Sequence, residues 1–345
     1  NNEFGLAKDA DGIASENLKP MYQDEYILGF QAQLTDNISG GVRGIYRDLK
    51  RAIDDQCDYR PIYAYAAANG LAFNPYNPGF AFCHLYNPGS DGIFNVDVDG
   101  NGTFEKITIP ADVLGPAAKR TYKALEFFAE GQWDKFFVQG SYTWAQSYGN
   151  TEGGVKSDIG QADTGTTQVF DYPELTIGSE GFLPNDRRHS FKVFGNYEIN
   201  DQWSVGANLL VQSGRPVNCF GFLGGTNTSH YANGYFSCDP GAPLPNSPAN
   251  DGAGNNGFTI VPRGTSGRTE WTRTLDLNVA YRPAFADGKL TFKADVFNVF
   301  DEHGVTTVNE FGEDATGNPT TSRTYKNPAT WQTPRTFRFM VQYDY

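Results

Sequence analysis

Nine segments of the chain alternate apolar and polar side chains with a period of two, and a short turn and a long loop join them in strict alternation. The last segment shows the pattern best, because Arg338, Met340, Gln342 and Asp344 alternate with Phe337, Phe339, Val341, Tyr343 and Tyr345. A period of two places successive side chains on opposite faces of a β-strand. We therefore expect strands at 22–34, 38–50, 120–133, 136–148, 187–199, 203–211, 269–282, 289–300 and 333–345.

The long connections favour a membrane barrel over a soluble β-sandwich. They cover 52–118, 149–184, 214–268 and 301–332, and structureless loops longer than about 15 residues are uncommon in compact domains. Outer-membrane barrels combine short periplasmic turns with long extracellular loops. Aromatic residues lie beside the short turns, where an interfacial girdle would fall: Trp133, Phe136, Trp203, Tyr281 and Tyr345. The expected fold class is all-β, an antiparallel transmembrane β-barrel with apolar faces toward lipid and polar faces toward the lumen.

Composition removes several alternatives. The chain has no run of about 20 apolar residues, which a membrane helix needs, but a β span needs only about 10 alternating residues. Its formal charge of −13 argues against nucleic-acid binding. The first residues have neither the basic start nor the apolar run of a signal peptide. The sequence is therefore either cytoplasmic or a mature or internal piece of an exported protein.

The count of nine strands conflicts with closure into a single-chain barrel. The first and ninth strands both run toward the short-turn side, whereas bacterial barrels have even, antiparallel strand counts. We therefore expect residues 1–345 to be the carboxy-terminal part of a larger barrel. Residues 1–18 would be the remnant of an extracellular loop, with the missing strands before Asn1.

Three stretches resemble the late barrel of TonB-dependent outer-membrane receptors. Two of them are Leu18-Lys19-Pro20 with Asp24-Glu25-Tyr26-Ile27-Leu28-Gly29-Phe30, and Ile45-Tyr46-Arg47-Asp48-Leu49-Lys50. The third, Asp295-Val296-Phe297-Asn298-Val299-Phe300-Asp301, is similar to the penultimate-strand pattern of that family. The aromatic-ended final strand resembles the signal read by the barrel-assembly machinery. The nearest group is the Oar-type receptors, which carry an amino-terminal carboxypeptidase-regulatory-like domain.

The resemblance implies a 22-stranded barrel in the outer membrane of a Gram-negative bacterium, filled by an amino-terminal plug that this chain lacks. The nine strands would be the fourteenth to the twenty-second. The implied function is a receptor and transporter that binds its ligand through extracellular loops. The implied partners are the amino-terminal barrel and plug portion, the TonB complex, the lipid bilayer and lipopolysaccharide. Two alternatives stay open, a passive porin-like channel and a structural docking platform for a surface protein.

The four cysteines lie in loops, two in each of two loops. An even count in loops favours local disulfides, Cys57–Cys83 and Cys219–Cys238, and hence an oxidising compartment. The alternative is a metal site, although the chain has no Cys-x-x-Cys motif.

Residues 97–105 resemble the opening of a calcium-binding loop. Asp97, Asp99 and Asn101 supply oxygens at positions 1, 3 and 5, and Glu105 falls at position 9, but Thr108 stands where a bidentate glutamate is needed. A weak Ca²⁺ site is one interpretation, and an Asx/Gly turn is the other.

Charged residues recur on the polar faces of the expected strands. The lumen-facing set is Arg43, Arg47, Glu126, Glu130, Lys192, Glu198, Asp276 and Arg338. Such residues either pair with one another or with a plug, or they line a substrate path whose selectivity they set.

The first long loop is unusually aromatic. Its candidate recognition residues are Tyr59, Tyr63, Tyr65, Tyr76, Phe80 and Tyr86. These rings either pack the loop on itself around the Cys57–Cys83 bridge or form a surface for a ligand or protein partner. We expect no enzyme, because no Ser–His–acid set or nucleophile elbow is present.

Overall fold

The structure is a computed structural model that describes residues 12–77, 80–161, 165–221, 234–236, 260–312 and 324–344. Its long strands are β1 (Tyr22–Thr35), β2 (Ile38–Arg51), β7 (Arg120–Gln132), β8 (Phe136–Gly149), β10 (His189–Glu198), β11 (Trp203–Gln212), β12 (Thr272–Tyr281), β13 (Leu290–Phe297) and β16 (Thr336–Tyr343). The short strands are β3 (Asp54–Gln56), β4 (His84–Tyr86), β5 (Gly92–Val96), β6 (Glu105–Ile109), β9 (Gly181–Phe182), β14 (Val305–Val308) and β15 (Pro328–Trp331). The helices are α1 (Arg60–Asn69), α2 (Ala111–Leu114), and the 3-10 turns η2 (Ser157–Ile159), η3 (Pro173–Thr176) and η4 (Ala284–Ala286).

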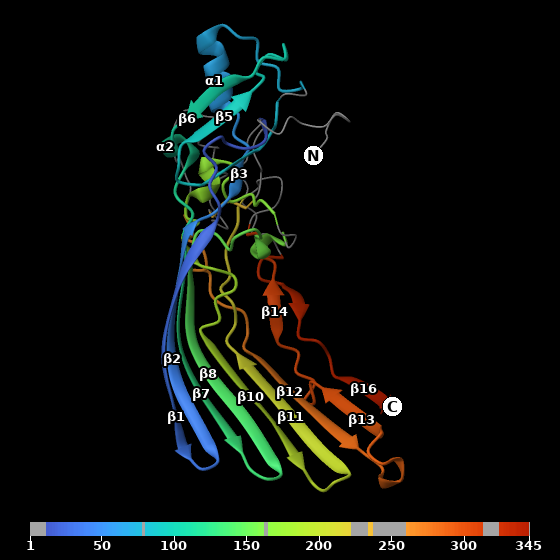
Figure 1. Cartoon of the computed structure of the whole chain (residues 1–345). Helices are drawn as coiled ribbons and strands as arrows, with labels where there is room; N and C mark the ends of the chain where they lie inside the picture. Colours follow the sequence, from blue (N-terminus) through green and yellow to red (C-terminus); the bar gives the residue numbers. More distant parts are fainter. Residues whose placement is uncertain are drawn as a thin grey trace.

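The nine long strands form one antiparallel sheet in the order of the chain, β1-β2-β7-β8-β10-β11-β12-β13-β16, and β9 adds to the end of β8. All nine expected strands are confirmed, with ends displaced by a few residues. The short turns lie at one end of the sheet and the long connections at the other (Figure 1). The predicted all-β, antiparallel fold class is thus confirmed. The described sheet is open, so it corresponds to a portion of a barrel. Eight successive antiparallel pairings leave the two edge strands, β1 and β16, running in the same direction.

Short polar side chains close the tight turns. Thr35 Oγ1 accepts the N–H groups of Asn37 at 3.3 Å and Ile38 at 3.1 Å. Asn200 Oδ1 accepts the N–H groups of Gln202 at 3.0 Å and Trp203 at 2.9 Å. Such side-chain acceptors replace the ladder bonds that the chain loses where it reverses.

One face of the sheet is apolar across its whole width. The register places Phe30, Val42, Phe127, Tyr142 and Phe191 in one row from β1 to β10. Large side chains on this face stay exposed, and Leu28 on β1 reaches 85 %. A band of this size on a protein surface marks contact with another apolar phase, and here that phase is lipid. None of the helices in the described part of the chain is long and apolar enough to span a membrane.

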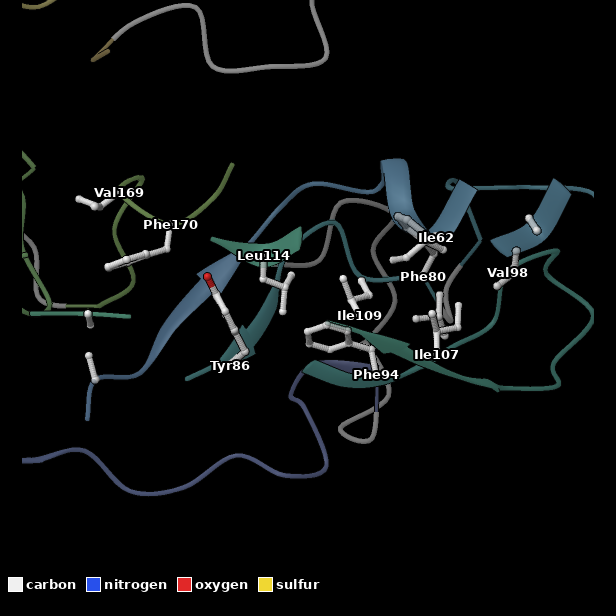
Figure 2. Close-up of a cluster of buried hydrophobic side chains, with 14 of the residues drawn as sticks. Ile62, Phe80, Tyr86, Phe94, Val98, Ile107, Ile109, Leu114, Val169 and Phe170 are labelled. Atoms are coloured by element: carbon white, nitrogen blue, oxygen red, sulfur yellow. The ribbon is translucent and has the colours of Figure 1, made fainter. Parts of the chain in front are cut away.

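Residues 52–118, expected as one long loop, contain short strands and helices, and most of their candidate aromatic rings pack the segment on itself, as one of our two interpretations predicted. Together with parts of the other three long connections, which hydrogen-bond to one another, residues 52–118 form a cap with its own hydrophobic core (Figure 2). Helix α1 begins at Arg60–Pro61 and ends at Gly70, whose φ of 70° allows its N–H to reach Ala66 O. A proline in the first turn and a left-handed glycine after the last are favourable helix ends. The core residues are Leu49, Ala52, Ile62, Ala66, Phe80, Tyr86, Phe94, Val96, Val98, Ile107, Ile109, Leu114, Ala118, Val169 and Phe170.

Candidate functional site: the polar face and the loop cap

Charged residues on the polar face meet as direct cross-strand pairs. Arg43 Nε donates to Glu126 Oε2 at 2.7 Å, and Arg47 Nε donates to Glu25 Oε1 at 2.9 Å. A third pair joins Arg338 Nε to Asp295 Oδ2 at 2.9 Å, on β16 and β13. Residues opposite each other in a ladder share a face. The sequence named one partner, Glu126, and missed Glu25 and Asp295 as partners of predicted residues.

The other predicted polar-face residues are spread over the sheet. Glu130 is opposite Ser39 and Gln139, Lys192 opposite Ser141 and Leu210, and Glu198 opposite Ser204. Asp276 faces Asn208 and accepts the N–H of Asn298 at 2.9 Å. The structure therefore does not gather the eight predicted residues into one site. Their lumenal orientation stays a proposal.

Aromatic rings form two rows on the lipid side. At the turn end, Trp133 stacks with Phe136 at 5.5 Å, and Trp203 stacks with Tyr281 at 4.5 Å. Tyr345, the fifth residue of the predicted girdle, lies outside the described residues. A second, unpredicted row lies near the loop end, where Tyr142, His189 and Trp271 stack at 6.1 and 5.8 Å.

The two rows are spaced like the two interfaces of a membrane. Tyr197 at the turn end and His189 at the loop end lie eight residues apart on β10. At about 3.3 Å per residue this is about 26 Å along the strand. A tilt of about 40° reduces it to about 20 Å, close to the roughly 25 Å apolar band of outer-membrane barrels.

The predicted calcium ligands accept hydrogen bonds from backbone N–H groups of their own loop. Asp97 accepts the N–H of Gly100 at 2.8 Å and of Gly102 at 3.1 Å, and Glu105 Oε2 accepts the N–H of Val98 at 3.1 Å. Asp99 and Asn101 likewise accept the N–H groups two residues later, at 3.1 and 2.7 Å. Gly100 and Gly102 have φ near +80°, which the turn requires. These bonds are those of an Asx/Gly turn between β5 and β6, and calcium binding at 97–105 stays a prediction.

The disulfide Cys57–Cys83 is present and closes the base of the α1 segment. Cys238 lies outside the described residues, so the Cys219–Cys238 pair stays a prediction. Among the described residues, the one group of three His, Cys, Asp or Glu side chains close enough to share a metal is Asp55 with Cys57 and Cys83. Its two sulfurs are bonded to each other. Burial lowers the pKa of nearby His84 to about 4, so this imidazole is neutral at physiological pH.

The six candidate recognition aromatics divide into three pairs by exposure. Phe80 and Tyr86 are 0 % and 1 % exposed in the cap core, so their assignment to a recognition surface is wrong (Figure 2). Tyr59 and Tyr65 pack partly buried against the same core. Tyr63 and Tyr76 are exposed at 57 % and 72 %.

Helix α1 and the residues after it form the part of the cap farthest from the sheet (Figure 1). We call residues 61–77 and 80–83 the cap tip. It carries no Asp, Glu, Lys or Arg, although 19 % of the whole chain is charged. Tyr63 stands at 86° to the Phe73 ring, which in turn meets the buried Phe80. The exposed Tyr63 ring is thus held in place by contacts that lead through Phe73 to the buried core.

A buried polar network that the sequence did not predict connects three of the long loops. We call Lys156, Asp158, Arg215, Asn218, Arg263 and Glu310 the loop hub. Arg263, at 0 % exposure, donates to Ser179 O at 2.7 Å and to Asp158 Oδ2 at 3.3 Å. Asn218 Nδ2 donates to Glu310 Oε2 at 2.7 Å and to Asp158 Oδ2 at 3.2 Å. Buried charges need such partners, because desolvating an unpaired ion is costly.

The cations of the hub lie close to aromatic rings and carboxylates, and one of its acids, Glu310, has a strongly shifted pKa. Lys156 Nζ lies 4.3 Å from the Phe220 ring centre and 3.5 Å from Asp158. Arg215 forms an ion pair with Glu310, yet burial raises the pKa of Glu310 to about 7. Burial lowers the pKa of Lys156. No sequence signal marks this network, because its members are single charges scattered over three loops.

A polar pocket of about 360 Å³ lies at the loop end of the polar face. Its lining residues are Gln23, Arg47, Arg120, Tyr122, Ser147 and Asn185. We call it the arginine pocket. The register places Arg47, Tyr122 and Ser147 directly opposite one another on β2, β7 and β8.

Comparison with known proteins finds similarity to outer-membrane transporters. No family model matches the chain. The TonB-dependent transporter Oar of Myxococcus xanthus is 26 % identical over 95 % of this chain. Among solved structures, the outer-membrane transporter YddB of Escherichia coli matches 97 % of this chain with a TM-score of 0.50 and 13 % identity, over 35 % of its own length. The ferric-catecholate import receptor Fiu of E. coli K12 matches 99 % of this chain and 30 % of its own, with 15 % identity and a TM-score of 0.42.

The chain therefore resembles the barrel of TonB-dependent receptors in both sequence and fold. It spans 29 % of the length of the Oar relative. This similarity and the lipid-facing band place the chain in an outer membrane, as predicted.

Proposed function

We propose that this chain is the carboxy-terminal barrel portion of a TonB-dependent outer-membrane receptor that binds its ligand through the extracellular loops. The observation that carries the proposal is the pair of open sheet edges. β1 pairs only with β2, and β16 only with β13, among the described strands. In a bilayer every backbone N–H and C=O needs a partner, so an open edge does not persist there.

Closure sets the number of strands that must be added. Since β1 and β16 run in the same direction, an antiparallel barrel needs an odd number of further strands between them. The 22-stranded barrel of TonB-dependent receptors, which this chain resembles, would add thirteen strands. A plug within that barrel would contact the polar face and carry the segment that binds the TonB complex.

The test is the intact mass of the protein extracted from outer membranes, compared before and after heat denaturation. A covalent chain much larger than 38.0 kDa supports the proposal, and so does a second polypeptide released only by heating. A folded chain of 38.0 kDa without a partner overturns it.

A permeability assay separates the receptor from a passive channel. We expect cells that carry the protein to exclude a large hydrophilic antibiotic whether or not TonB is present, because a plug fills the lumen. Antibiotic entry that continues in a strain without TonB would favour the porin-like alternative. The similar proteins are named transporters and receptors, and we propose no catalytic role for this chain.

We place ligand recognition on the cap tip, through Tyr63 and Tyr76. Interface centres are rich in tyrosine and poor in charge, as the tip is. We expect Tyr63→Ala with Tyr76→Ala to remove the growth advantage of the wild-type strain over a deletion strain in mixed culture. Phe285→Ala is the matched control, because Phe285 is 83 % exposed but lies at the opposite end of the sheet, in the β12–β13 turn.

The uncharged tip also favours the docking-platform alternative. A platform would keep its partner without TonB, whereas a receptor needs TonB for the growth advantage. Loss of the advantage on deleting TonB supports the receptor, and a retained advantage supports the platform.

A further inference from the structure

The arginine pocket combines two guanidinium groups with neutral hydrogen-bonding groups. Its lining contains no aspartate or glutamate among the described residues. Arg47 lies over the Tyr122 ring, with its Cζ 5.3 Å from the ring centre. Arg120 Nη2 donates to Gln23 Oε1 at 3.2 Å, and its Nη1 donates to the backbone oxygen of Glu152. Arg120 therefore meets neutral acceptors on both sides.

The pocket carries more positive than negative charge. Glu25 contacts Arg47 through Nε at 2.9 Å, and both side chains are partly exposed, at 36 % and 43 %. Glu152 interacts electrostatically with Arg120 in the same way, so each guanidinium has one neighbouring carboxylate, and neither carboxylate lines the pocket. In a chain with a formal charge of −13, the described lining of the pocket itself carries only positive charge.

The excess continues behind the pocket. The N–H of the lining residue Ser147 donates to Asp186 Oδ1 at 2.6 Å. Arg268 and Arg188 both pair with this one buried carboxylate, Arg188 at 3.7 Å. Arg187 donates to Ser213 O at 3.2 Å, and burial together with Arg215 and Arg268 lowers its pKa. Arginines thus outnumber carboxylates on the adjoining loop segment as well.

We propose that the arginine pocket binds an anionic group, a carboxylate or a phosphate, of the ligand that enters the lumen. Guanidinium groups bind both anions through paired N–H donors. Gln23, Tyr122 and Asn185 add neutral polar contacts that orient the anion. The volume of about 360 Å³ falls within the range of small-molecule sites. This inference rests on the proposed receptor function and names the chemical class of its ligand.

The test uses the full-length protein from outer membranes, titrated calorimetrically with citrate and, separately, with inorganic phosphate. We expect wild-type protein to bind at least one of them. Arg120→Gln and Arg47→Gln should each weaken binding by at least about 10-fold, as expected for losing a charge-assisted hydrogen bond. Arg120→Lys should give an intermediate loss, because it keeps the charge and loses the planar fork.

Lys119→Gln is the matched control. Lys119 precedes Arg120 but pairs with Glu180 in solvent, at 3.0 Å and 56 % exposure, and does not line the pocket. Its variant should bind within about 2-fold of wild type, since exposed ion pairs contribute little. A heat-dependent gel shift reports whether each barrel is folded, and Arg47→Gln serves if Arg120→Gln does not fold.

Citrate binding without phosphate binding assigns the site to carboxylates, and the reverse assigns it to phosphates. Failure of the wild-type protein to bind either anion overturns the proposal, as does binding that Arg47→Gln and Arg120→Gln leave unchanged. A plugged, TonB-dependent receptor that binds neither anion would overturn the pocket alone. A chain of 38.0 kDa that folds without a partner would overturn the proposed function instead.

Discussion

Aromatic residues on the sheet and in the cap have opposite surroundings. Phe30 on β1 and Phe339 on β16 are 70 % and 79 % exposed, whereas Phe80 and Phe94 in the cap are fully buried. Phe30 and Phe339 face lipid, whereas Phe80 and Phe94 pack against other side chains in a protein core. The outward face of the sheet needs only side chains that are apolar, but the cap needs side chains that fit one another.

Charged residues show the same contrast. The Arg43–Glu126 pair on the sheet leaves its side chains 47 % and 16 % exposed, whereas Arg263 and Asp158 in the loop hub are both at 0 %. Exposed pairs contribute little to stability, but removing one partner of a buried pair leaves an uncompensated charge. The cap should therefore be sensitive to single charge changes that the sheet tolerates.

The largest expected effect comes from Arg263→Met. It leaves Asp158 buried with fewer donors, and we expect the cap to lose about 3–5 kcal/mol of stability. Native-state hydrogen exchange of the cap amides measures this loss. Lys119→Met removes an exposed pair of similar chemistry and should cost at most about 1 kcal/mol. Equal losses in the two variants would contradict the contrast between buried and exposed charge.

Removal of the Cys57–Cys83 disulfide should follow closely. The two cysteines are 26 residues apart, and a loop of that length corresponds to about 3.5 kcal/mol in the chain-entropy description. We expect Cys57→Ser with Cys83→Ser to lower the exchange protection of the cap amides, while sheet amides keep theirs. A parallel loss in β10 and β11 would show that cap and sheet unfold together, and the comparison would fail.

Val193→Arg tests whether the apolar face of the sheet contacts lipid. Val193 lies midway between the two aromatic rows, opposite Gly140 and Leu209. An arginine at the bilayer midplane of a barrel costs about 2–4 kcal/mol, which urea unfolding in lipid vesicles measures by tryptophan fluorescence. Val113→Arg is the control, because Val113 in α2 is 42 % exposed in the water-facing cap. It should change stability by about 0.5 kcal/mol or less, and a similar cost at both sites would argue against a lipid-facing surface.

The sheet was predictable because every strand repeats the same two-residue pattern. The lipid face asks only for apolar side chains at alternate positions, so Phe337, Phe339 and Val341 reveal their strand without knowledge of any neighbour. The turns added a second local signal, since Asn200 and its neighbours mark a reversal. The same logic found the turn-side aromatic row but missed the second one, in which His189 at the start of β10 and Trp271 just before β12 come together only in the folded sheet.

The cap was not predictable because its contacts are long-range and aperiodic. Asp158 and Arg263 are 105 residues apart, and each looks like an ordinary loop charge in the sequence. Their contact also needs a glycine, since a Cβ at Gly181 would lie 2.0 Å from Arg263 O. Phe80 illustrates the same limit, because a dense aromatic loop fits both a surface patch and a core. Only the fold decides between the two.

The smallest expected effect per measured step is a pH dependence of the cap that the sheet lacks. Burial raises the pKa of Glu310 from 4.5 to about 7 in the folded cap, even though Arg215 opposes that shift. Lys156, Asp158, Asn218 and Arg263 complete the hub around it. The folded cap holds this proton where the unfolded chain has lost it, so its stability is highest below about pH 4.5. We expect stability to fall as the pH rises toward 7, by at most about 1.4 kcal/mol per pH unit for one proton.

Glu310→Gln should flatten this slope between pH 4.5 and 7, because the amide cannot ionise. Burial also raises the pKa of Asp54 to about 7, so part of the slope should remain in the variant. Glu16→Gln is the control with the opposite sign. Its hydrogen bond from Lys106 lowers the pKa of Glu16, so its contribution disappears only as the pH falls below about 4.5. Hydrogen exchange of the cap amides at a series of pH values separates the two variants. If Glu310→Gln left the slope unchanged, the Arg215 ion pair would hold Glu310 charged, and burial would not dominate the electrostatics of the hub.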